Sequence, residues 1–263
     1  MDFRRLTAAQ IAAYLAALQR PGPALLRFLA ADSRGAVRRL AARYEAAREA
    51  ARAERRRLRR LYGEERGRGR TGQLVAGVDE VGRGCLAGPV VAGAVILSGA
   101  PIVGLDDSKR LPSTERARLA TEIRGRALAV AVGEASVEEI NRLNILGATR
   151  LAMRRAVEAL IPSPDFLLID GRDRLPLGLA QATIVDGDAS RACIAAASIV
   201  AKVARDEMMR GLDDAFPGYG FARHKGYGTA DHLAALSLHG PCALHRRAFL
   251  PVVRTVLFQM ESP

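Results

Sequence analysis

The sequence has no tryptophan and few other aromatic residues, five tyrosines and seven phenylalanines. Its three cysteines, Cys85, Cys193 and Cys242, are far apart and form no Cys-x-x-Cys pair. This argues against a disulfide framework or a cysteine-built zinc site and fits a reducing compartment. No apolar run approaches the ~18 residues that a membrane-spanning helix needs, and the N-terminus leads into an amphipathic segment rather than a secretion signal. We therefore expect a cytoplasmic protein with no membrane contact.

Lysine is scarce as well, because the chain has only Lys109, Lys202 and Lys225 beside 37 arginines. Residues 1–72 carry 18 arginines and 7 acids, whereas residues 73–263 carry the other 22 basic residues and 21 acids. Of the net charge of +12, residues 1–72 therefore carry +11 and residues 73–263 carry +1. A basic segment of this kind is typical of nucleic-acid contact. The alternative explanation is a coding bias toward arginine, with the charges merely solvated.

The first 72 residues predict a helical extension. Apolar spacing predicts a helix over 8–18 with Thr7 as N-cap, a short helix over 24–30, and a long Ala/Arg/Glu helix that ends near residue 61. Asp32 or Ser33 is the candidate cap of the long helix. The Gly/Arg-rich segment 63–72 predicts a linker. We therefore place a domain boundary between a basic helical extension, 1–72, and a body, 73–263.

The body alternates between strand and helix patterns. The expected strands are 74–81, 90–97, 127–135, 166–169 and 182–185, and the expected helices are 143–160, 190–216 and 229–239. Three strands that look antiparallel precede a strand–helix alternation. This order is typical of an α/β layer fold with a mixed sheet.

The most informative segment combines an acid pair with a glycine-flanked arginine. Asp79 and Glu80 close a short apolar strand, and Gly82, Arg83 and Gly84 follow directly. Buried carboxylates are costly in free energy unless positive charge lies against them. Glycines let backbone approach a ligand more closely than a residue with a Cβ allows. The segment therefore predicts a site for metal ions and a phosphodiester.

Two later acids follow a similar pattern, and four carboxylates could converge at one edge of the sheet. Asp170 ends a buried strand, and ligand sites of open α/β sheets lie beyond strand carboxyl ends; Asp188 directly precedes a long helix. Clustered carboxylates repel one another, and divalent cations such as Mg²⁺ or Mn²⁺ relieve that repulsion. Two such ions could clamp the attacking and leaving oxygens of a displacement at phosphorus.

Each acid also has a structural explanation. Asp188 or Asp186 can cap the following helix, and Asp170 before a glycine can be a turn residue. Neighbours on a strand face opposite sides, so Asp79 and Glu80 share a site only if the strand ends or bulges there. A straight ladder through Glu80 would count against a shared site.

Further candidates lie in loops and on the long helix. Lys109 can reach a phosphate or belong to a solvated loop, and Tyr227, between two glycines, can stack on a base or sugar or simply pack. We expect Lys202, Arg205 and Asp206 to form helix-face ion pairs. The histidines lack the spacing of a compact metal motif and are expected in the core or on the surface: His224, His232, His239 and His245.

Several linked segments closely resemble bacterial ribonuclease HII, in that family's order, over about residues 74–255. They are Gly77–Val90, Asp107–Lys109, Leu168–Gly171, Gly187–Asp188, Ala195–Asp206 and His224–Thr229. The resemblance implies a ribonuclease H-like fold, with a mixed five-stranded sheet flanked by helices and a C-terminal helical part. It implies an endonuclease for RNA in RNA/DNA hybrids and for single ribonucleotides in duplex DNA, leaving 3′-hydroxyl and 5′-phosphate ends by two-metal-ion hydrolysis.

Residue by residue, the resemblance also implies a site. The metal-binding and catalytic acids fall on Asp79, Glu80, Asp170 and Asp188, with two Mg²⁺ or Mn²⁺ ions as cofactors. The backbone reader of the ribose 2′-hydroxyl falls on Gly82, Arg83 and Gly84, with Tyr227 against the next nucleotide; Lys109 joins the substrate contacts. Where the family often has Lys-Gly-Asp, this chain has Asp186-Gly187-Asp188, so Asp186 is an alternative ligand.

The resemblance does not indicate what the N-terminal extension does, because the matching motifs all lie in the body of the chain. We expect a monomer that acts on RNA/DNA hybrids and ribonucleotide-containing DNA. The rivals are a nucleic-acid binder without catalysis and a DNA-directed nuclease of the same fold superclass.

Overall fold

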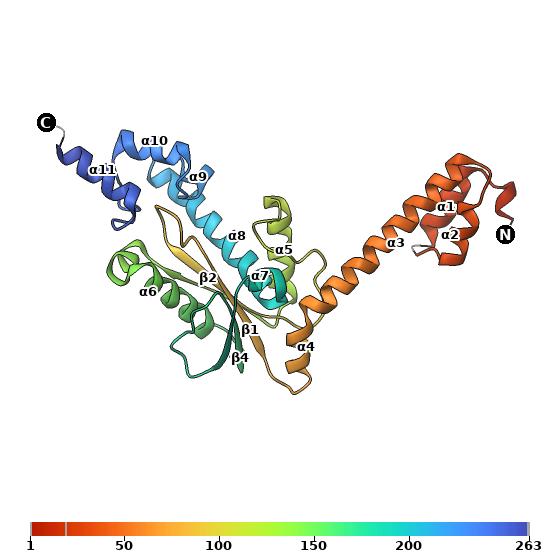
Figure 1. Ribbon diagram of the computed structural model, residues 1–263, viewed down its shortest axis with the longest axis horizontal. Helices are drawn as coiled ribbons and strands as arrows, with labels where there is room; N and C mark the ends of the chain where they lie inside the picture. Colours follow the sequence, from red (N-terminus) through yellow and green to blue (C-terminus); the bar gives the residue numbers. More distant parts are fainter. Residues whose placement is uncertain (1, 19, 262–263) are drawn as a thin grey trace. The chain divides into compact units, whose positions relative to one another are not determined.

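The computed structural model describes residues 2–18 and 20–261 of the chain (Figure 1). The chain folds into two compact units, residues 1–59 and 60–263. Among the described residues, no helix is long and apolar enough to span a lipid bilayer.

The N-terminal unit is helical, as the sequence predicts. It contains the 3-10 helix η1 (Phe3–Arg5), α1 (Ala8–Ala17), α2 (Pro23–Ala30) and most of α3 (Gly35–Leu61). The predicted cap of α1 is confirmed, because Thr7 and Gln10 form a capping box, with the Thr7 hydroxyl accepting from the Gln10 amide at 3.2 Å. A small core of Ile11, Leu15 and Leu29 packs against Val37 and Ala41 of α3.

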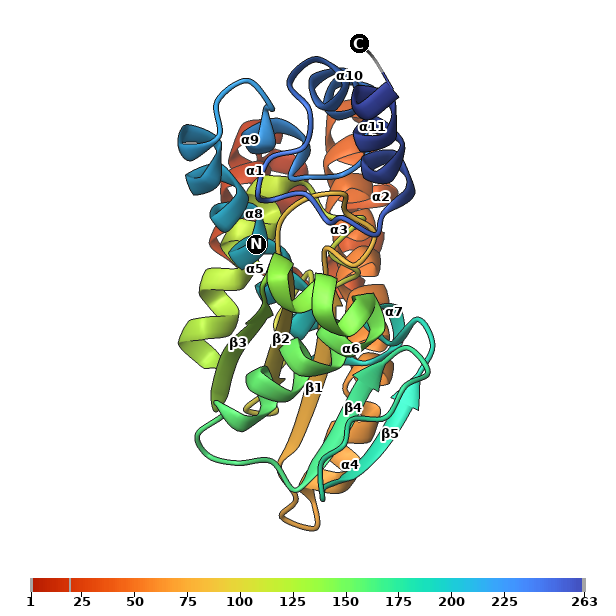
Figure 2. The same cartoon turned by 90° about the vertical axis from the view of Figure 1, so that its left-hand side faces the viewer.

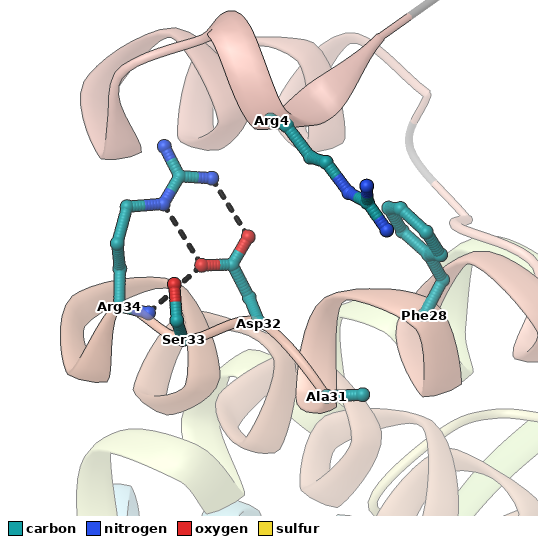
Figure 3. A pocket seen from close by; sticks show the side chains of 6 residues that line it. All are labelled: Arg4, Phe28, Ala31, Asp32, Ser33 and Arg34. Atoms are coloured by element: carbon teal, nitrogen blue, oxygen red, sulfur yellow. Dashed lines mark hydrogen bonds and ion pairs between the residues drawn. The ribbon is translucent and has the colours of Figure 1, made fainter.

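Asp32 fixes the turn between α2 and α3, as Figure 3 shows. Its carboxylate accepts the Arg34 amide at 2.9 Å and two guanidinium hydrogens of the same residue at 2.8 and 2.7 Å. These bonds lower the pKa of Asp32 to about 2. The guanidinium also donates to the backbone oxygen of Phe3 at 3.1 Å, so this arginine joins η1 to the start of α3.

A helix replaces the linker that the sequence predicts after residue 62. Residues Gly63–Gly69 form α4, whose first-turn acids are favourable at a helix N-terminus. Glu64 pairs with Arg191 at 2.8 Å, and Glu65 accepts the Cys193 amide at 2.8 Å. The glycine content favours a linker locally, but these long-range bonds stabilise a helix.

The C-terminal unit is built on a mixed five-stranded sheet, as the sequence and the resemblance predict. In the described residues its order is β3-β2-β1-β4-β5 (Figure 2). The strands are β1 (Val75–Val81), β2 (Val90–Ile96), β3 (Ala129–Ala135), β4 (Phe166–Asp170) and β5 (Ala180–Ile184). The first three pair antiparallel, whereas β4 lies parallel to β1 and β5 parallel to β4.

Two long helices cover the two faces of this sheet (Figure 1). Helix α6 (Val137–Glu158) packs on one face and α8 (Ala192–Ala215) on the other. Helix α6 has a kink at Asn144 (φ +58°), so the predicted helix from residue 143 corresponds to the part after the kink, and a further segment precedes it, capped by Ser136 and Glu139. The remaining helices are α5 (Ser113–Arg126), which the sequence did not predict, α7 (Gly187–Ser190), α9 (Phe221–His224), α10 (Ala230–His239) and α11 (Leu250–Glu261).

Helix α8 lies directly on the backbone of β1 and β2, because glycines face it. A Cβ placed on Gly77 would be 2.1 Å from the carbonyl carbon of Cys193, and one on Gly93 would be 2.3 Å from the Ala197 oxygen. This close approach sets the position of α8 relative to the end of β1, where Asp79 lies.

We predict that Gly77→Ala forces α8 away from the sheet and lowers the free energy of unfolding of the C-terminal unit by about 1–3 kcal/mol. Urea denaturation of the full chain measures the change. The control is Gly125→Ala on α5, whose Cβ would meet nothing within 4 Å and which should gain up to about 1 kcal/mol from helix propensity. Equal effects of the two substitutions would contradict the packing argument.

Candidate active site

Asp79 and Glu80 lie near the end of β1, in an asymmetric environment. Pairing with β2 continues straight through both residues to Val81, so the strand end or bulge expected for a shared site is absent on that side, and this counts against a shared site. Pairing with β4, in contrast, ends at Val78. The side of β1 that faces β4 is therefore open beyond Val78, and there Asp170 ends the neighbouring strand.

The Asp79 carboxyl group is almost completely buried, with 4% of the residue exposed. Burial raises its pKa well above the ordinary value, and the charges of Glu80 and Asp170 raise it further. A hydrogen bond from the Ser198 hydroxyl on α8 acts in the opposite direction. The hydroxyl oxygens of Ser108 and Ser198 lie 2.9 Å apart. Two hydrogen-bonded hydroxyl groups therefore connect the 106–111 loop to Asp79.

Glu80 and Asp170 lie close enough to affect each other electrostatically. Burial raises the pKa of Glu80 and Asp170 raises it further, while Arg83, 3.6 Å away, opposes the shift. Burial likewise raises the pKa of Asp170, and Asp188 adds to the shift against the opposing bond from the Gly187 amide. That amide donates to Asp170 Oδ1 at 2.7 Å, so this acid also bonds the backbone at the start of α7.

Asp188 is buried inside α7, with 5% of the residue exposed. The helix-capping explanation does not describe it, because the N-cap of the long helix α8 is Arg191, and Asp186, at the N-cap of α7, makes no capping bond. Lys109 Nζ lies 3.3 Å from Asp188 Oδ2, although the lysine side chain is 80% exposed. Burial alone would lower the pKa of Lys109, but Asp188 and Asp107 raise it above the ordinary value.

The donor chemistry of these acids fits a divalent cation. Carboxylates are hard oxygen ligands, and burial together with mutual repulsion creates a demand for positive charge that Lys109 and Arg83 meet only in part. Among residues 2–18 and 20–261, no three acid, histidine or cysteine side chains are already arranged to hold a metal ion. The acids are thus electrostatically coupled without forming a finished ligand cage.

The glycine loop (residues 82–84) follows β1, and two buried arginines bond the backbone of the loop and of the residues directly after it. Arg246 donates to the Arg83 oxygen at 3.0 Å and to the Gly88 oxygen at 2.8 Å. Arg205 of α8 donates to the oxygens of Pro89 and Ala87, at 3.0 and 3.1 Å. Both residues are fully buried, and burial together with the charge of Arg205 lowers the pKa of Arg246 to about 10. Fixed backbone geometry follows from these bonds.

The two glycines of the loop differ in their surroundings. Gly82 has φ +86°, and a Cβ there would be 2.1 Å from Arg205 Nε. Gly84 is exposed, and a Cβ there would meet nothing within 4 Å. The chain itself therefore requires glycine at position 82 but leaves open space at position 84.

Only part of the predicted ion pairing on α8 is confirmed. Lys202 and Asp206 pair at 2.7 Å, but Arg205 points to the backbone oxygens beneath the glycine loop instead. Nothing in its polar sequence neighbourhood indicates that the guanidinium is buried.

Tyr227 is exposed, with 37% of the residue accessible to solvent. Its ring lies 5.4 Å from the Lys202 ammonium and 5.8 Å from the Arg205 guanidinium carbon. Burial raises the pKa of Tyr227, as does the neighbouring Cys85, to which its hydroxyl is hydrogen-bonded. The tyrosine therefore touches the residue that directly follows the glycine loop.

Two buried histidines support the backbone of Tyr227. His245 Nδ1 accepts the Cys242 amide at 3.0 Å, so its Nε2 carries the proton and donates to His232 Nε2 at 3.1 Å. His232 Nδ1 then donates to the Tyr227 oxygen at 2.9 Å. This series of hydrogen bonds requires that both His232 and His245 are neutral. The expectation that the histidines are core or surface residues is confirmed, since His224, His232 and His245 are buried and His239 is exposed.

Comparisons with known proteins show the family of the chain and the class of its fold. The ribonuclease HII family profile matches residues 76–252, and the profile of the ribonuclease HII N-terminal domain matches residues 7–67. Ribonuclease HII of Acidovorax sp. (strain JS42) is 58% identical over 184 residues, 70% of this chain and 88% of that protein. Ribonuclease H2 from Pyrococcus horikoshii OT3 superposes with a TM-score of 0.61 at 23% identity, over 72% of this chain and 99% of that one. Bst-RNase HIII in complex with Mn²⁺ superposes with a TM-score of 0.53 at 22% identity, over 72% of this chain and 71% of that one.

The superpositions define the class of the fold, which is ribonuclease H-like. With a profile that matches most of the chain and relatives of this identity, the chain belongs to the ribonuclease HII family. It is a ribonuclease H, an endoribonuclease of RNA/DNA hybrids, in a family that uses divalent metal ions.

We predict that the His232–His245 pair makes stability depend on pH. Burial, and then His232, lowers the pKa of His245 to about 4, whereas the unfolded chain takes up the proton near its ordinary value of about 6.5. The stabilisation is therefore complete above pH 6.5 and falls by about 2–3 kcal/mol as the pH drops toward 4.

Urea denaturation between pH 7 and 5 measures this effect. His245→Gln should be less stable at pH 7 and should show a flatter pH dependence than the wild type. His239→Gln, at an exposed histidine, is the control and should keep the wild-type dependence. A His245→Gln variant with the wild-type pH slope would show that this imidazole does not titrate as described.

Proposed function

We propose that this enzyme hydrolyses RNA in RNA/DNA hybrids and cuts duplex DNA on the 5′ side of a single embedded ribonucleotide, leaving 3′-hydroxyl and 5′-phosphate ends. The observation that carries the proposal is the coupled set of buried or half-buried carboxylates at the end of β1 and β4. Such a set excludes a bare phosphodiester by repulsion and accepts one only together with cations. A nucleic-acid binder without catalysis would gain nothing from it.

Asp79, Glu80, Asp170 and Asp188 are the proposed ligands of two Mg²⁺ or Mn²⁺ ions, and Asp186 is the alternative ligand from α7. When bound, such ions supply the charge that neutralises the carboxylates and the Lewis acidity that activates water and a leaving oxygen. The Mn²⁺ complex of Bst-RNase HIII supports a site of this kind. The positions of the acids determine where cations bind, and thereby the place to which the substrate phosphate is attracted.

The glycine loop is the proposed reader of the ribose 2′-hydroxyl. Arg246 bonds the Arg83 oxygen, Arg205 lies against Gly82, and the open space above Gly84 lets a sugar approach. A hydroxyl bonded to fixed backbone groups distinguishes RNA from DNA at one position. Tyr227 is the proposed contact for the following sugar.

Lys109 is the proposed phosphate contact in the 106–111 loop. Its ammonium is mostly exposed yet lies against Asp188, so it can partner that acid in the free enzyme and a phosphate oxygen in the complex. The chain acts, in this proposal, as a cytoplasmic monomer that begins the removal of misincorporated ribonucleotides.

We predict that Asp79→Asn lowers cleavage of a duplex with one embedded ribonucleotide by at least about a hundredfold without loss of stability. Asparagine removes a buried charge whose neighbours repel it, so the thermal unfolding midpoint should stay level or rise. Cleavage kinetics and thermal denaturation of the same preparation measure both. Retained cleavage in the variant would refute the assignment of Asp79.

Gly84→Ala tests the proposed 2′-hydroxyl reader. The added methyl group meets no protein atom, so folding should be unchanged while cleavage at a ribonucleotide falls by about tenfold or more, because the methyl occupies space meant for the sugar. Gly82→Ala is the comparison, since it clashes with Arg205 and should lower stability as well. Unchanged cleavage by a folded Gly84→Ala variant would remove Gly84 from the reader.

A further inference from the structure

The N-terminal unit has a basic groove of about 900 Å³ along α3. The guanidinium groups that line it come from α3 and from the connection between α1 and α2: Arg20, Arg48, Arg52, Arg55, Arg56 and Arg59. No acidic residue is among the lining residues, and the remaining walls are small or apolar. We call this feature the arginine groove.

The arginines of the arginine groove form one stripe on α3. Arg48, Arg52, Arg55 and Arg59 are spaced by four, three and four residues, which places them on the same face of a helix. Within the described residues, none of the six lining arginine side chains makes a hydrogen bond or an ion pair. Like charges at this spacing destabilise a helix by a few tenths of a kcal/mol per pair.

Some arginines of the chain are paired with acids at helical spacing. On α5, Arg118 pairs with Glu115 and Glu122 at 2.6 and 2.8 Å, and on α3 itself Arg57 pairs with Glu54 at 2.7 Å. Within the described residues Arg27 and Arg39, outside the groove, also make no ion pair. The arginine groove differs because its unpaired arginines line one concave surface without an acid, and this points to an anionic ligand.

The dimensions of the stripe favour a polyanion over a small anion. The eleven helical steps from Arg48 to Arg59 span about 16 Å, so the guanidinium groups of the stripe do not converge on one ion. A nucleic-acid strand presents a phosphate about every 3.4 Å of its axis, and guanidinium groups bind phosphate oxygens bidentately. Tyr44, the aromatic residue in the lining, already lies beside Arg43, so stacking on bases contributes little.

We propose that the arginine groove binds the phosphodiester backbone of the duplex that carries the cleavage site. The identity of that duplex rests on the proposed function. The groove reads neither base nor ribose and adds affinity to any nucleic-acid duplex. Because α3 continues into the C-terminal unit, binding at the groove raises the local concentration of duplex for that unit.

The experiment compares two triple variants of the full chain with equal net charge. Arg52→Gln/Arg55→Gln/Arg59→Gln removes the stripe, and the control replaces three exposed arginines outside the groove by glutamine, Arg27, Arg39 and Arg43. Helical periodicity places Arg39 and Arg43 on the opposite side of α3. Duplex binding is measured in EDTA, without cleavage, over a series of salt concentrations, for all-DNA and for one-ribonucleotide duplexes.

We expect the stripe variant to flatten the slope of log affinity against log salt by about 0.9 for each phosphate that is no longer neutralised, or about 2.7 for the three substitutions together, on both duplexes. In cleavage assays KM should rise while kcat stays unchanged. The control variant should match the wild type in slope and KM. Equal slopes for the stripe variant and the control would overturn the proposal.

The same measurements separate this proposal from the proposed function. If cleavage proves independent of the 2′-hydroxyl but the stripe variant still flattens the salt slope, the groove stands and the assigned reaction fails. If cleavage requires the 2′-hydroxyl and the slope is unchanged, the reaction stands and the groove fails.

Discussion

The direct packing of α8 on the backbone of β1 and β2 is the constraint on which the rest of the site depends. Glycines at the two points of closest approach, Gly77 and Gly93, let the helix lie where any larger residue would displace it. From that position one helix carries Ser198 to the buried Asp79 and Arg205 to the loop that follows β1. Displacing α8 would therefore disturb the acids and the loop together.

The site separates charges of opposite sign into two buried sets. Carboxylates gather where β1 and β4 end, and burial raises the pKa of Asp79 and Asp170. Arg205 and Arg246 lie beneath the glycine loop and are satisfied by backbone oxygens instead of acids. These two arginines therefore hold the backbone that follows β1 in place, while Arg83 and Lys109 are the cations that act on the acids.

Much of this site could be predicted from sequence, because its acids lie at strand ends that a parallel pair brings together. Asp79 and Asp170 follow short apolar runs, which can be recognised as strands from the neighbouring residues alone. The role of Arg246 could not be predicted, since a guanidinium bonded to distant backbone oxygens leaves no trace in nearby residues. Helix α4 was missed for a related reason, because Glu64 finds its partner Arg191 far along the chain. Local patterns predict elements and their ends, whereas long-range hydrogen bonds decide which polar residues become buried.

The central claim is that the carboxylates and the glycine loop act as one site that cuts where a single 2′-hydroxyl lies. The most direct test is cleavage by the wild-type chain of a duplex with one embedded ribonucleotide, mapped to the nucleotide in Mg²⁺ and in Mn²⁺. The account predicts a single cut on the 5′ side of the ribonucleotide, with a 3′-hydroxyl end, and no cut in the matched all-DNA duplex. Equal cutting of both duplexes, or cutting in EDTA, would contradict it.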